Sequence, residues 1–387
     1  MKNKGYDRRR FLQLGGLAAV ASTISPALYG AGLFNKSDAS TLFTEEEKIR
    51  LFSNENPYGP GEKVMDAINS QIKRVNHYAS FHQYDTNHLK EAIATKNGIN
   101  TDQVILGHGS FDILRMLTRS FGNTENSLIM PALTFNVVGR FADKVFDHKQ
   151  IEIPLDSEMN IDLKATAKAV TNETKLVFIC NPNNPTGRIL KASELEDFCK
   201  EVASEECVVA IDEAYIDMVA PSERPDTVKL LLQKHNVLIL RTFSKAYGMA
   251  GLRVGYAMGL PETVEKIYGE HYTFNGLINT LGVVAAITAL EDDTHVNAFR
   301  SKNLEVRSYT ENALRSMGIE FLPSSTNFLL INIKEIEKYR NKLNDAGISP
   351  VGGSGKTYPN WSRISIGDQK TMEKYISVVQ TMDWLVK

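Results

Sequence analysis

The sequence predicts an α/β protein in which a mainly parallel central sheet, flanked by helices, forms a large domain beside a smaller α+β domain. Between residues 89 and 258, helical stretches alternate with short apolar runs such as Val208–Ile211 and Val237–Leu240. Strands that alternate with helices in this way are typical of parallel sheets. Beyond Pro261 the pattern changes to long helices followed by a strand at Asn327–Ile333. A chain of 387 residues has room for two such domains.

Composition and charge argue against several kinds of partner. Hydrophobic residues make up 42% and charged residues 23% of the chain, as in ordinary globular proteins. The formal net charge of −2 gives no reason to expect nucleic acid or an anionic membrane as a partner. Neither the cysteines nor the histidines show disulfide or metal-ligand spacing, so we expect no disulfide framework and no metal. The residues concerned are the three cysteines, Cys180, Cys199 and Cys207, and four of the eight histidines, His77, His82, His88 and His108.

The N-terminal segment, residues 1–35, is predicted to be a targeting segment that is not part of the fold. Three arginines, Arg8–Arg10, and then Phe11–Leu12 precede an apolar, glycine- and alanine-rich run from Leu14 to Ile24. The run is too short to span a bilayer as a mature helix, so no stable membrane anchor is expected. The segment resembles a bacterial twin-arginine signal, which implies export of the folded protein. The alternative is a disordered basic N-terminus.

Three further parts are expected after this segment. Residues 36–75 form an N-terminal arm and part of the small domain, residues 76–285 the large domain, and residues 286–387 the small C-terminal domain. An apolar helix at about Gly276–Leu290 is expected to lead out of the large domain. A charged helix near Thr294–Met317 then begins the small domain.

The centre of the predicted site is Lys245, in the stretch Leu238–Tyr256. Lys245 lies between two short apolar runs that are typical of buried strands, so its ammonium is expected to lose hydration. Desolvation lowers the pKa of a lysine, which favours an amine that bonds covalently to a carbonyl. The neighbouring Thr242, Ser244 and Arg253 could hold a phosphate close to this amine. The alternative is an ordinary solvated loop lysine.

Three other turns carry polar groups to the ends of predicted strands. Gly107–Ser110 joins a strand to the helix Phe111–Phe121, where backbone N–H groups could converge on an anion. Asn181–Gly187 forms a rigid turn after Lys175–Cys180, at the edge where open α/β sheets bind ligands. Asp212 closes a third buried strand, where an aspartate is costly unless it is paired. A capping or turn role is the alternative for this aspartate.

Together these motifs resemble those of the fold-type I, class I and II pyridoxal-phosphate aminotransferases, most closely the histidinol-phosphate aminotransferases. The segments that carry the resemblance are N-E-N-P-Y-G-P from Asn54, N-P-N-N-P-T-G from Asn181, D-E-A-Y from Asp212, T-F-S-K from Thr242, A-G-L-R-V-G from Ala250 and R-I-S-I-G from Arg363. The resemblance runs from about Leu51 to the C-terminus. It implies the fold-type I architecture and an N-terminal arm that lies near the active site.

The resemblance implies pyridoxal 5'-phosphate as the cofactor and gives a role to each site residue. Lys245 is implied to bind the cofactor covalently, Asp212 to pair with its protonated ring nitrogen, and Tyr215 to act with them in catalysis. Phe135 is implied to stack on the ring, and Asn184 and Tyr215 to contact the ring oxygen. The phosphate is implied to bind the backbone or side chains of Gly109, Ser110, Phe111, Thr242, Ser244 and Arg253.

Two features depart from the pattern of these relatives. Relatives carry an acidic pair after the turn serine, where this chain has Phe111 and Asp112. Relatives also build each active site from two subunits, with a tyrosine that reaches the neighbouring phosphate. Phe81 falls near the place of that tyrosine, and Tyr84 follows a few residues later. A homodimer is therefore implied, with either residue in the position of the tyrosine.

The implied reaction transfers an amino group between an amino acid, or histidinol phosphate, and a 2-oxo acid such as 2-oxoglutarate. One alternative is a pyridoxal-phosphate-dependent amino-acid decarboxylase on the same scaffold, because the residues around the ring are common to both. A second alternative, from another class, is a non-catalytic protein that binds the cofactor.

The anionic end of the substrate is expected to bind Arg363, with Asn184 beside it. Alternation along the strand places Arg363 and Ser365 on one face, although a surface arginine is the alternative. Relatives carry a second arginine in a segment G-I-x-V-R, where Gly347–Gly353 of this chain has none. Two forked guanidinium groups suit a phosphate dianion, and one suffices for a carboxylate. We therefore expect an unphosphorylated amino acid as substrate, unless Lys356 compensates for the missing arginine.

Overall fold

The computed structural model describes residues 48–79, 85–125, 128–271, 278–350, 353–354 and 358–385. Several expectations fall outside these described residues: the targeting segment 1–35, the first part of the arm, and the positions of Phe81, Tyr84 and Lys356. Residues Ile49–Lys387 form one unit, and this unit contains two main sheets.

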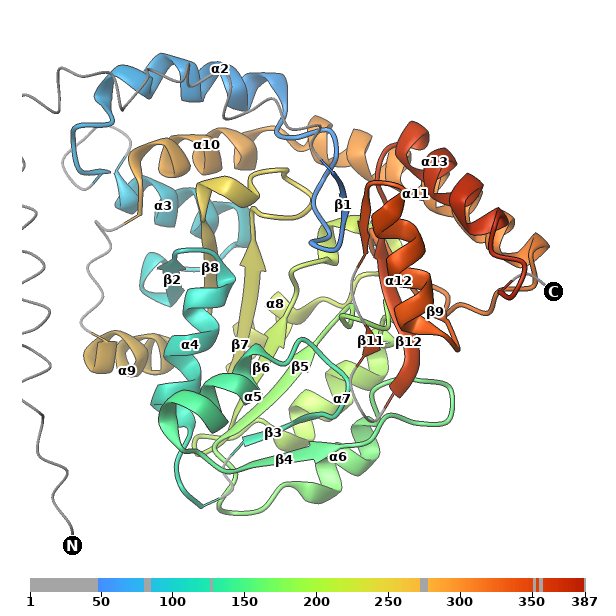
Figure 1. The fold of residues 1–387 in the computed structure, drawn as a ribbon. Coiled ribbons are helices and arrows are strands. Elements are labelled where there is room, and N and C mark those ends of the chain that lie inside the picture. The colour runs from blue at the N-terminus through green and yellow to red at the C-terminus, as the bar shows by residue number, and fades with distance from the viewer. Residues whose placement is uncertain are drawn as a thin grey trace, which may run out of the picture. The chain divides into compact units, whose positions relative to one another are not determined.

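The larger sheet has seven strands in the described residues, in the order β2-β8-β7-β6-β5-β3-β4 (Figure 1). The strands are β2 (Val104–Gly107), β3 (Leu128–Pro131), β4 (Gln150–Ile153), β5 (Leu176–Cys180), β6 (Val208–Asp212), β7 (Val237–Thr242) and β8 (Gly255–Met258). Strands β7, β6, β5, β3 and β4 pair in parallel, which confirms the mainly parallel sheet. Strand β8 is antiparallel to both β7 and β2, because the chain reverses through the Lys245 loop between β7 and β8.

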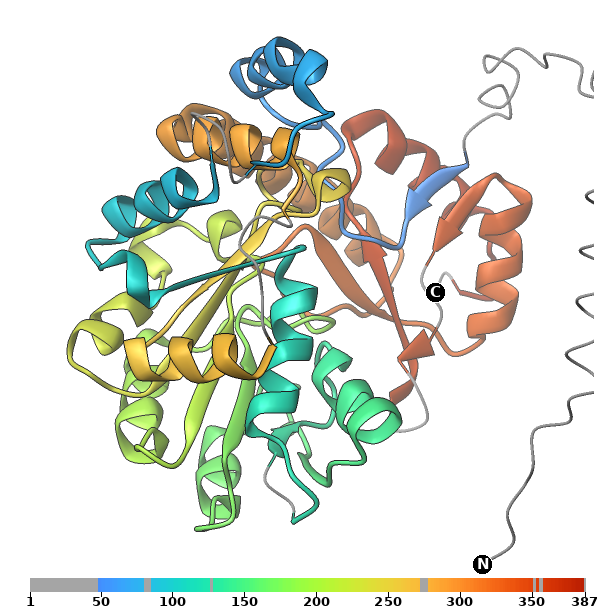
Figure 2. The same cartoon turned by 90° about the vertical axis from the view of Figure 1, so that its left-hand side faces the viewer.

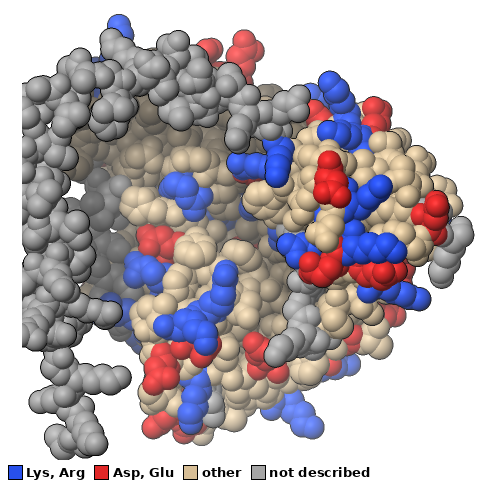
Figure 3. Space-filling model, viewed as in Figure 1, with Lys and Arg blue, Asp and Glu red and all other residues tan. Residues whose placement is uncertain are grey.

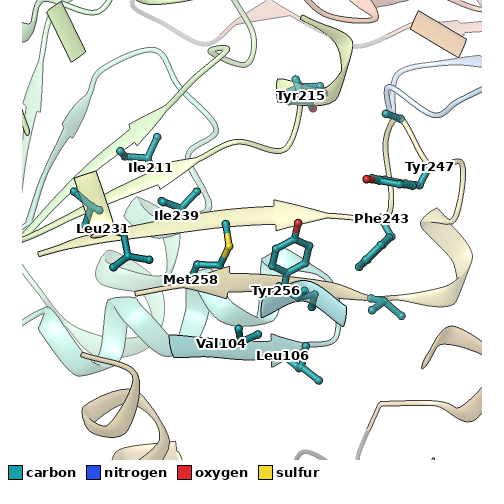
Figure 4. Close-up of a cluster of buried hydrophobic side chains, with 14 of the residues drawn as sticks. Val104, Leu106, Ile211, Tyr215, Leu231, Ile239, Phe243, Tyr247, Tyr256 and Met258 are labelled. Atoms are coloured by element: carbon teal, nitrogen blue, oxygen red, sulfur yellow. The ribbon is translucent and has the colours of Figure 1, made fainter. Parts of the chain in front are cut away.

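Helices cover both faces of this sheet (Figure 2). One hydrophobic cluster packs α3 (Thr86–Asn97), α6 (Leu163–Ala169), α7 (Ala192–Val202), α8 (Thr227–Leu232) and α10 (Thr280–Glu291) against the sheet. A second cluster packs α4 (Ser110–Phe121), α5 (Val137–Phe141) and α9 (Pro261–His271). Along β7, Val237 and Ile239 belong to the first cluster, whereas Leu238 and Leu240 belong to the second, as the two-residue repeat of a strand requires. Figure 4 shows part of the first cluster around Ile239 and Met258.

The smaller sheet carries the C-terminal part of the site. Its order is β11-β12-β9, with β9 (Phe328–Asn332), β11 (Gly353–Ser354) and β12 (Tyr358–Ser365) antiparallel. Helices α11 (Asp293–Ser316), α12 (Ile336–Asp345) and α13 (Gln369–Gln380) surround a third hydrophobic cluster. The predicted helices near 276–290 and 294–317 are confirmed as α10 and α11, with slightly different ends.

The N-terminal arm first contacts the part of the molecule that holds the smaller sheet and then the part that holds the large sheet. Strand β1 (Ile49–Leu51) pairs in parallel with β10 (Ile348–Pro350). Helix α2 (Glu62–Gln71) then packs along α10. The segment between β1 and α2 therefore runs past both sheets, as Figure 1 shows.

The carboxyl ends of the parallel strands meet at one edge of the large sheet, and this edge positions the site. Cys180 at the end of β5 lies opposite Asp212 at the end of β6, and Asp212 lies opposite Leu240 of β7. The turn Asn181–Gly187, Asp212 and the Lys245 loop therefore leave the sheet side by side. Open α/β sheets bind ligands at this edge.

The surface is mixed in charge on the face shown in Figure 3, where basic and acidic side chains are interspersed. Within the part of the chain that the structure describes, no helix is both long and apolar enough to cross a membrane. All three cysteines are buried and free.

Candidate active site

A cavity of about 340 Å³ lies at the carboxyl edge of the large sheet. It has the size of a small-molecule site. Eleven of the twelve residues predicted for the site line it: Ser110, Phe111, Phe135, Asn184, Asp212, Tyr215, Thr242, Ser244, Lys245, Arg253 and Arg363. The twelfth, Gly109, directly precedes Ser110. Residues from three regions of the sequence thus meet in one cavity.

Lys245 lies in the loop between β7 and β8, with its amine enclosed by the arm. Its Nζ donates a hydrogen bond of 2.7 Å to the carbonyl oxygen of Ser53 and lies 5.8 Å from the centre of the Tyr215 ring. Burial, together with the nearby charge of Arg363, lowers the pKa of Lys245 to about 8. This is the direction expected for a lysine between two buried strands. The amine can therefore lose its proton near neutral pH.

Asp212 ends β6 and is only 2% exposed. Its Oδ1 accepts a hydrogen bond of 3.1 Å from the backbone N–H of Ala214. Burial raises the pKa of Asp212 to about 6, and the nearby Lys245 opposes that rise. The next residue, Glu213, faces elsewhere and forms a buried ion pair of 2.9 Å with Nε of Arg241. Asp212 is thus the carboxylate of this pair that lines the cavity and can meet a cation there.

Two glycines allow the turn before α4 to lie close to Arg253. Gly109 has a φ of 75°, and a Cβ there would lie 2.3 Å from Nη2 of Arg253. A Cβ on Gly255 would lie 2.3 Å from the backbone nitrogen of Ser110. Side chains at either position would fill the space that the two segments share. The sequence predicted the turn but not the close approach of β8.

The donors that surround this turn suit a phosphate group. Ser110 is the first residue of α4, where unpaired N–H groups and the helix dipole favour an anion. The hydroxyl of Thr242 donates to that of Ser244 at 3.0 Å. The guanidinium of Arg253 donates from Nη1 to Ser244 Oγ at 3.3 Å and from Nη2 to the carbonyl oxygen of His108 at 3.2 Å.

The two phenylalanines of the predicted site have different surroundings. Phe135 is partly buried and lines the cavity after β3. Phe111 is 46% exposed and packs edge-on against Phe141, with ring centres 5.4 Å apart. Where relatives carry an acidic pair, Asp112 instead pairs with Arg115 at 3.0 Å. Phe111 thus offers its backbone N–H at the start of α4, as the sequence analysis expected.

Arg363 reaches the cavity from β12 of the smaller sheet. Its Nη1 donates to Oδ1 of Asn184 at 2.6 Å, and its Nη2 donates to the carbonyl oxygen of Phe52. Among the described residues, its Nε is buried without a hydrogen-bond partner, and no carboxylate forms an ion pair with it. Burial lowers the pKa of Arg363. Ser365 lies on the same face of the strand and contacts Asn54, which confirms the predicted alternation.

The arm supplies site residues that residue-level reasoning missed. Asn54 is 1% exposed and donates from Nδ2 to the Tyr215 hydroxyl at 3.0 Å. The side chain of Asn327 donates to the carbonyl oxygens of Asn54 and Glu55 at 3.0 and 3.2 Å. The resemblance placed the arm near the site but gave none of these contacts. The available signal was the N-E-N-P motif, because an asparagine tolerates the left-handed φ of 54° found at Asn54.

These groups fit pyridoxal 5'-phosphate. The glycine-lined turn with its N–H, hydroxyl and guanidinium donors fits the phosphate, the Asp212 carboxylate fits a protonated ring nitrogen, and the Lys245 amine fits the aldehyde carbon. When bound, the cofactor acts as an electron sink that makes the α-proton of an amino substrate acidic.

We predict that Gly109→Ala weakens binding of pyridoxal 5'-phosphate to the apoprotein about tenfold. The added Cβ would displace the Arg253 guanidinium, and φ of 75° strains an alanine. Gly251→Ala is the matched control, because nothing lies within 4 Å of a Cβ at Gly251. Equilibrium binding to both apoproteins checks this. Equal affinities would contradict the assignment of the turn to the phosphate.

Comparisons with known proteins agree with this geometry. Residues 46–379 match the family described as "Aminotransferase class I and II". A histidinol-phosphate aminotransferase from Moorella thermoacetica is 35% identical over 87% of this chain and 85% of that protein. One from Brevibacillus brevis is 36% identical over 89% of this chain and 92% of that protein.

Solved structures show the same fold. The histidinol-phosphate aminotransferase of Sinorhizobium meliloti, solved in complex with pyridoxal-5'-phosphate, superposes with a TM-score of 0.77 at 24% identity, over 86% of this chain and 91% of that one. The Thermus thermophilus aspartate aminotransferase with maleate gives a TM-score of 0.74 at 21% identity, over 87% and 91% of the two chains. This chain belongs to the class I and II aminotransferases, which are pyridoxal-phosphate-dependent transaminases of fold type I.

Proposed function

We propose that this aminotransferase takes an unphosphorylated amino acid as its amino donor and a 2-oxo acid such as 2-oxoglutarate as acceptor. The observation that carries the proposal is Arg363, whose guanidinium lines the cavity without an ion-pair partner among the described residues. An arginine of this kind suits the α-carboxylate that both substrates share. Asn184 holds the guanidinium in place through its Oδ1.

Histidinol phosphate is the second candidate donor, because the relatives bear the name of that activity. Its phosphate dianion would be served best by two forked guanidinium groups. Gly347–Gly353, where relatives carry the second arginine, contains none in this chain. Lys356, which could compensate as a point charge, lies outside the described residues. The single arginine favours a carboxylate.

The predicted residues that line the cavity have distinct proposed roles. Lys245 binds the cofactor and, with a pKa of about 8, moves the proton of the substrate's α-carbon. Asp212 keeps the ring nitrogen protonated, since a carboxylate in a dry site favours a neighbouring cation. With the cofactor bound, Phe135 would stack on its ring, and Asn184 and Tyr215 would contact its ring oxygen. The residues that would hold the phosphate are Gly109, Ser110, Phe111, Thr242, Ser244 and Arg253.

A decarboxylase on the same scaffold would share this machinery. Product analysis separates the two reactions, because a transaminase converts the donor into a 2-oxo acid with all its carbon atoms. A decarboxylase releases carbon dioxide instead.

The same proposal includes a homodimer. Exposed apolar side chains follow one another along α2 and the turn after it, at Met65, Ile72, Val75 and Tyr78, each more than 40% exposed. Exposed apolar surface of this kind favours association. Phe81 or Tyr84 takes the place of the tyrosine that reaches the neighbouring phosphate in relatives. Light scattering of the purified chain measures its mass and so distinguishes a monomer from a homodimer.

Export by the twin-arginine route is also part of the proposal. It is supported by the sequence Arg8-Arg9-Arg10-Phe11-Leu12 and the short apolar run that follows. A phosphorylated biosynthetic intermediate would not normally meet an exported enzyme, so export favours a free amino acid. Cell fractionation of wild type and a variant with Arg8, Arg9 and Arg10 replaced by lysine should show loss of export in the variant.

We predict that Lys245→Ala folds but loses the visible absorption of the lysine-bound cofactor. Turnover should fall by about 10³-fold or more, because the residue that moves the proton is gone. Lys191→Ala, an exposed lysine paired with Glu194, is the control and should match wild type. Absorption spectra and steady-state rates measure both effects. An unchanged spectrum in Lys245→Ala would exclude this residue as the cofactor's anchor.

We further predict that free amino acids are better donors than histidinol phosphate by kcat/KM, with 2-oxoglutarate as acceptor. Arg363→Ala should lower kcat/KM for amino acids by about tenfold to hundredfold, the effect of a lost charge-assisted hydrogen bond. Arg340→Ala, a helix α12 arginine paired with Glu337, is the control. The proposal is wrong if histidinol phosphate is the best donor, or if Arg363→Ala leaves amino-acid turnover intact.

A further inference from the structure

The Tyr215 hydroxyl receives hydrogen bonds from two side-chain amides. Asn54 Nδ2 lies 3.0 Å from it and Asn184 Nδ2 lies 3.2 Å from it. All three residues are less than 5% exposed, so water does not compete for these contacts. Tyr215 follows β6, Asn184 follows β5, and Asn54 comes from the arm, so three segments distant in sequence meet at one oxygen.

The direction of the Asn184 amide is determined by Arg363. A guanidinium has only donors, so the atom of Asn184 that lies 2.6 Å from Nη1 of Arg363 must be the amide oxygen. The NH₂ group of Asn184 therefore faces Tyr215. A flipped amide would place two donors against each other at the arginine.

The direction of the Asn54 amide follows from the proton of the Ser365 hydroxyl, which needs an acceptor. The backbone N–H of Asn54 donates to Oγ of Ser365 at 2.9 Å, so this oxygen acts as an acceptor there. The Ser365 hydroxyl then donates its own proton to Oδ1 of Asn54 at 2.7 Å. The NH₂ group of Asn54 is left for Tyr215.

Two donated hydrogen bonds occupy the acceptor positions of the Tyr215 oxygen, which leaves the phenolic proton as a donor. Burial raises the pKa of Tyr215, so this proton is retained at neutral pH. The remaining open direction is the cavity that Tyr215 lines. The charged or titratable groups that face Tyr215 are Arg363, Asp212, Lys245 and Cys180.

We propose that Asn54 and Ser365 are positioning residues that fix the Tyr215 hydroxyl as a hydrogen-bond donor toward the ring oxygen of the cofactor. The inference rests on the proposed roles of Lys245 and Tyr215. Asn54 and Ser365 act through Tyr215, whose hydroxyl they orient. Because Ser365 and Arg363 share β12, the smaller sheet controls both the hydroxyl that serves the cofactor and the arginine that serves the substrate.

The test is a pH titration of the visible absorption of the holoenzyme. A hydrogen bond donated to the cofactor stabilises its proton-poor form, so loss of the donor raises the titration midpoint. Asn54→Gly removes the amide, and glycine accepts the φ of 54° found there. We expect its midpoint to rise by about one pH unit and the dissociation constant of the cofactor to rise about fivefold.

A double-mutant cycle distinguishes orientation of the Tyr215 hydroxyl by Asn54 from a general loss of order in the site. In a Tyr215→Phe background, Asn54→Gly should cause no further shift of the midpoint, because the hydroxyl that it orients is absent. Asn327→Ala is the matched control, since it removes hydrogen bonds to the arm's backbone but leaves the Asn54 side chain in place. It should lower the melting temperature without a shift of the midpoint.

Variants of Ser365 provide an independent test if Asn54→Gly does not fold. Ser365→Ala should raise the midpoint, and Ser365→Thr, which keeps a hydroxyl, should restore it. The inference is overturned if Asn54→Gly and Ser365→Ala titrate as wild type, if the two shifts add in the double mutant, or if Asn327→Ala gives the same shift. Failure of the proposed function is distinguishable, because wild type would then show no visible absorption that depends on Lys245.

Discussion

Removal of water from the carboxyl edge of the large sheet is the constraint on which the rest of the site depends. The strands that end there are buried on both faces, so Asp212 at the end of β6 is almost fully enclosed. Loss of hydration disfavours the charged form of any group, which moves acids and amines in opposite directions. The pKa of Asp212 therefore rises to about 6 and that of Lys245 falls to about 8. Both groups can exchange a proton near neutral pH, which neither could do in water.

The N-terminal arm also encloses the site, and its backbone carbonyl oxygens accept hydrogen bonds from cationic side chains that line the cavity. The carbonyl oxygens of Phe52 and Ser53 accept hydrogen bonds from Arg363 and Lys245, two of the cationic side chains that line the cavity. A buried cation without an acceptor would be costly, so these contacts stabilise the arm and the cations together. A substrate carboxylate would compete with the Phe52 carbonyl for Arg363, and it would do so with a full negative charge.

Polar contacts in this site are ordered because some partners allow only one direction. Arginine donates and never accepts, and a backbone N–H does the same. From these fixed ends, the amides of Asn184 and Asn54 take the only orientations that leave every donor an acceptor. The smaller sheet enters this network through Arg363 and Ser365, two residues apart on β12. The geometry of the cofactor region is therefore linked to the part of the molecule that holds the substrate's anionic end.

The sequence by itself determined the mainly parallel sheet and the strand ends that carry Asp212 and Lys245, and its resemblance to a known family pointed to eleven of the seventeen residues that line the cavity. These features are local: periodicity places strands, glycines and prolines place turns, and the carboxyl ends of parallel strands meet by topology. Only the tertiary structure decided the role of Asn54, the close approach of Gly255 to Ser110, and the pairing of Glu213 with Arg241. Each of these contacts joins residues between 28 and 161 positions apart or depends on the antiparallel return of β8. No local pattern encodes such a contact, because packing of whole elements sets which polar groups remain to be satisfied.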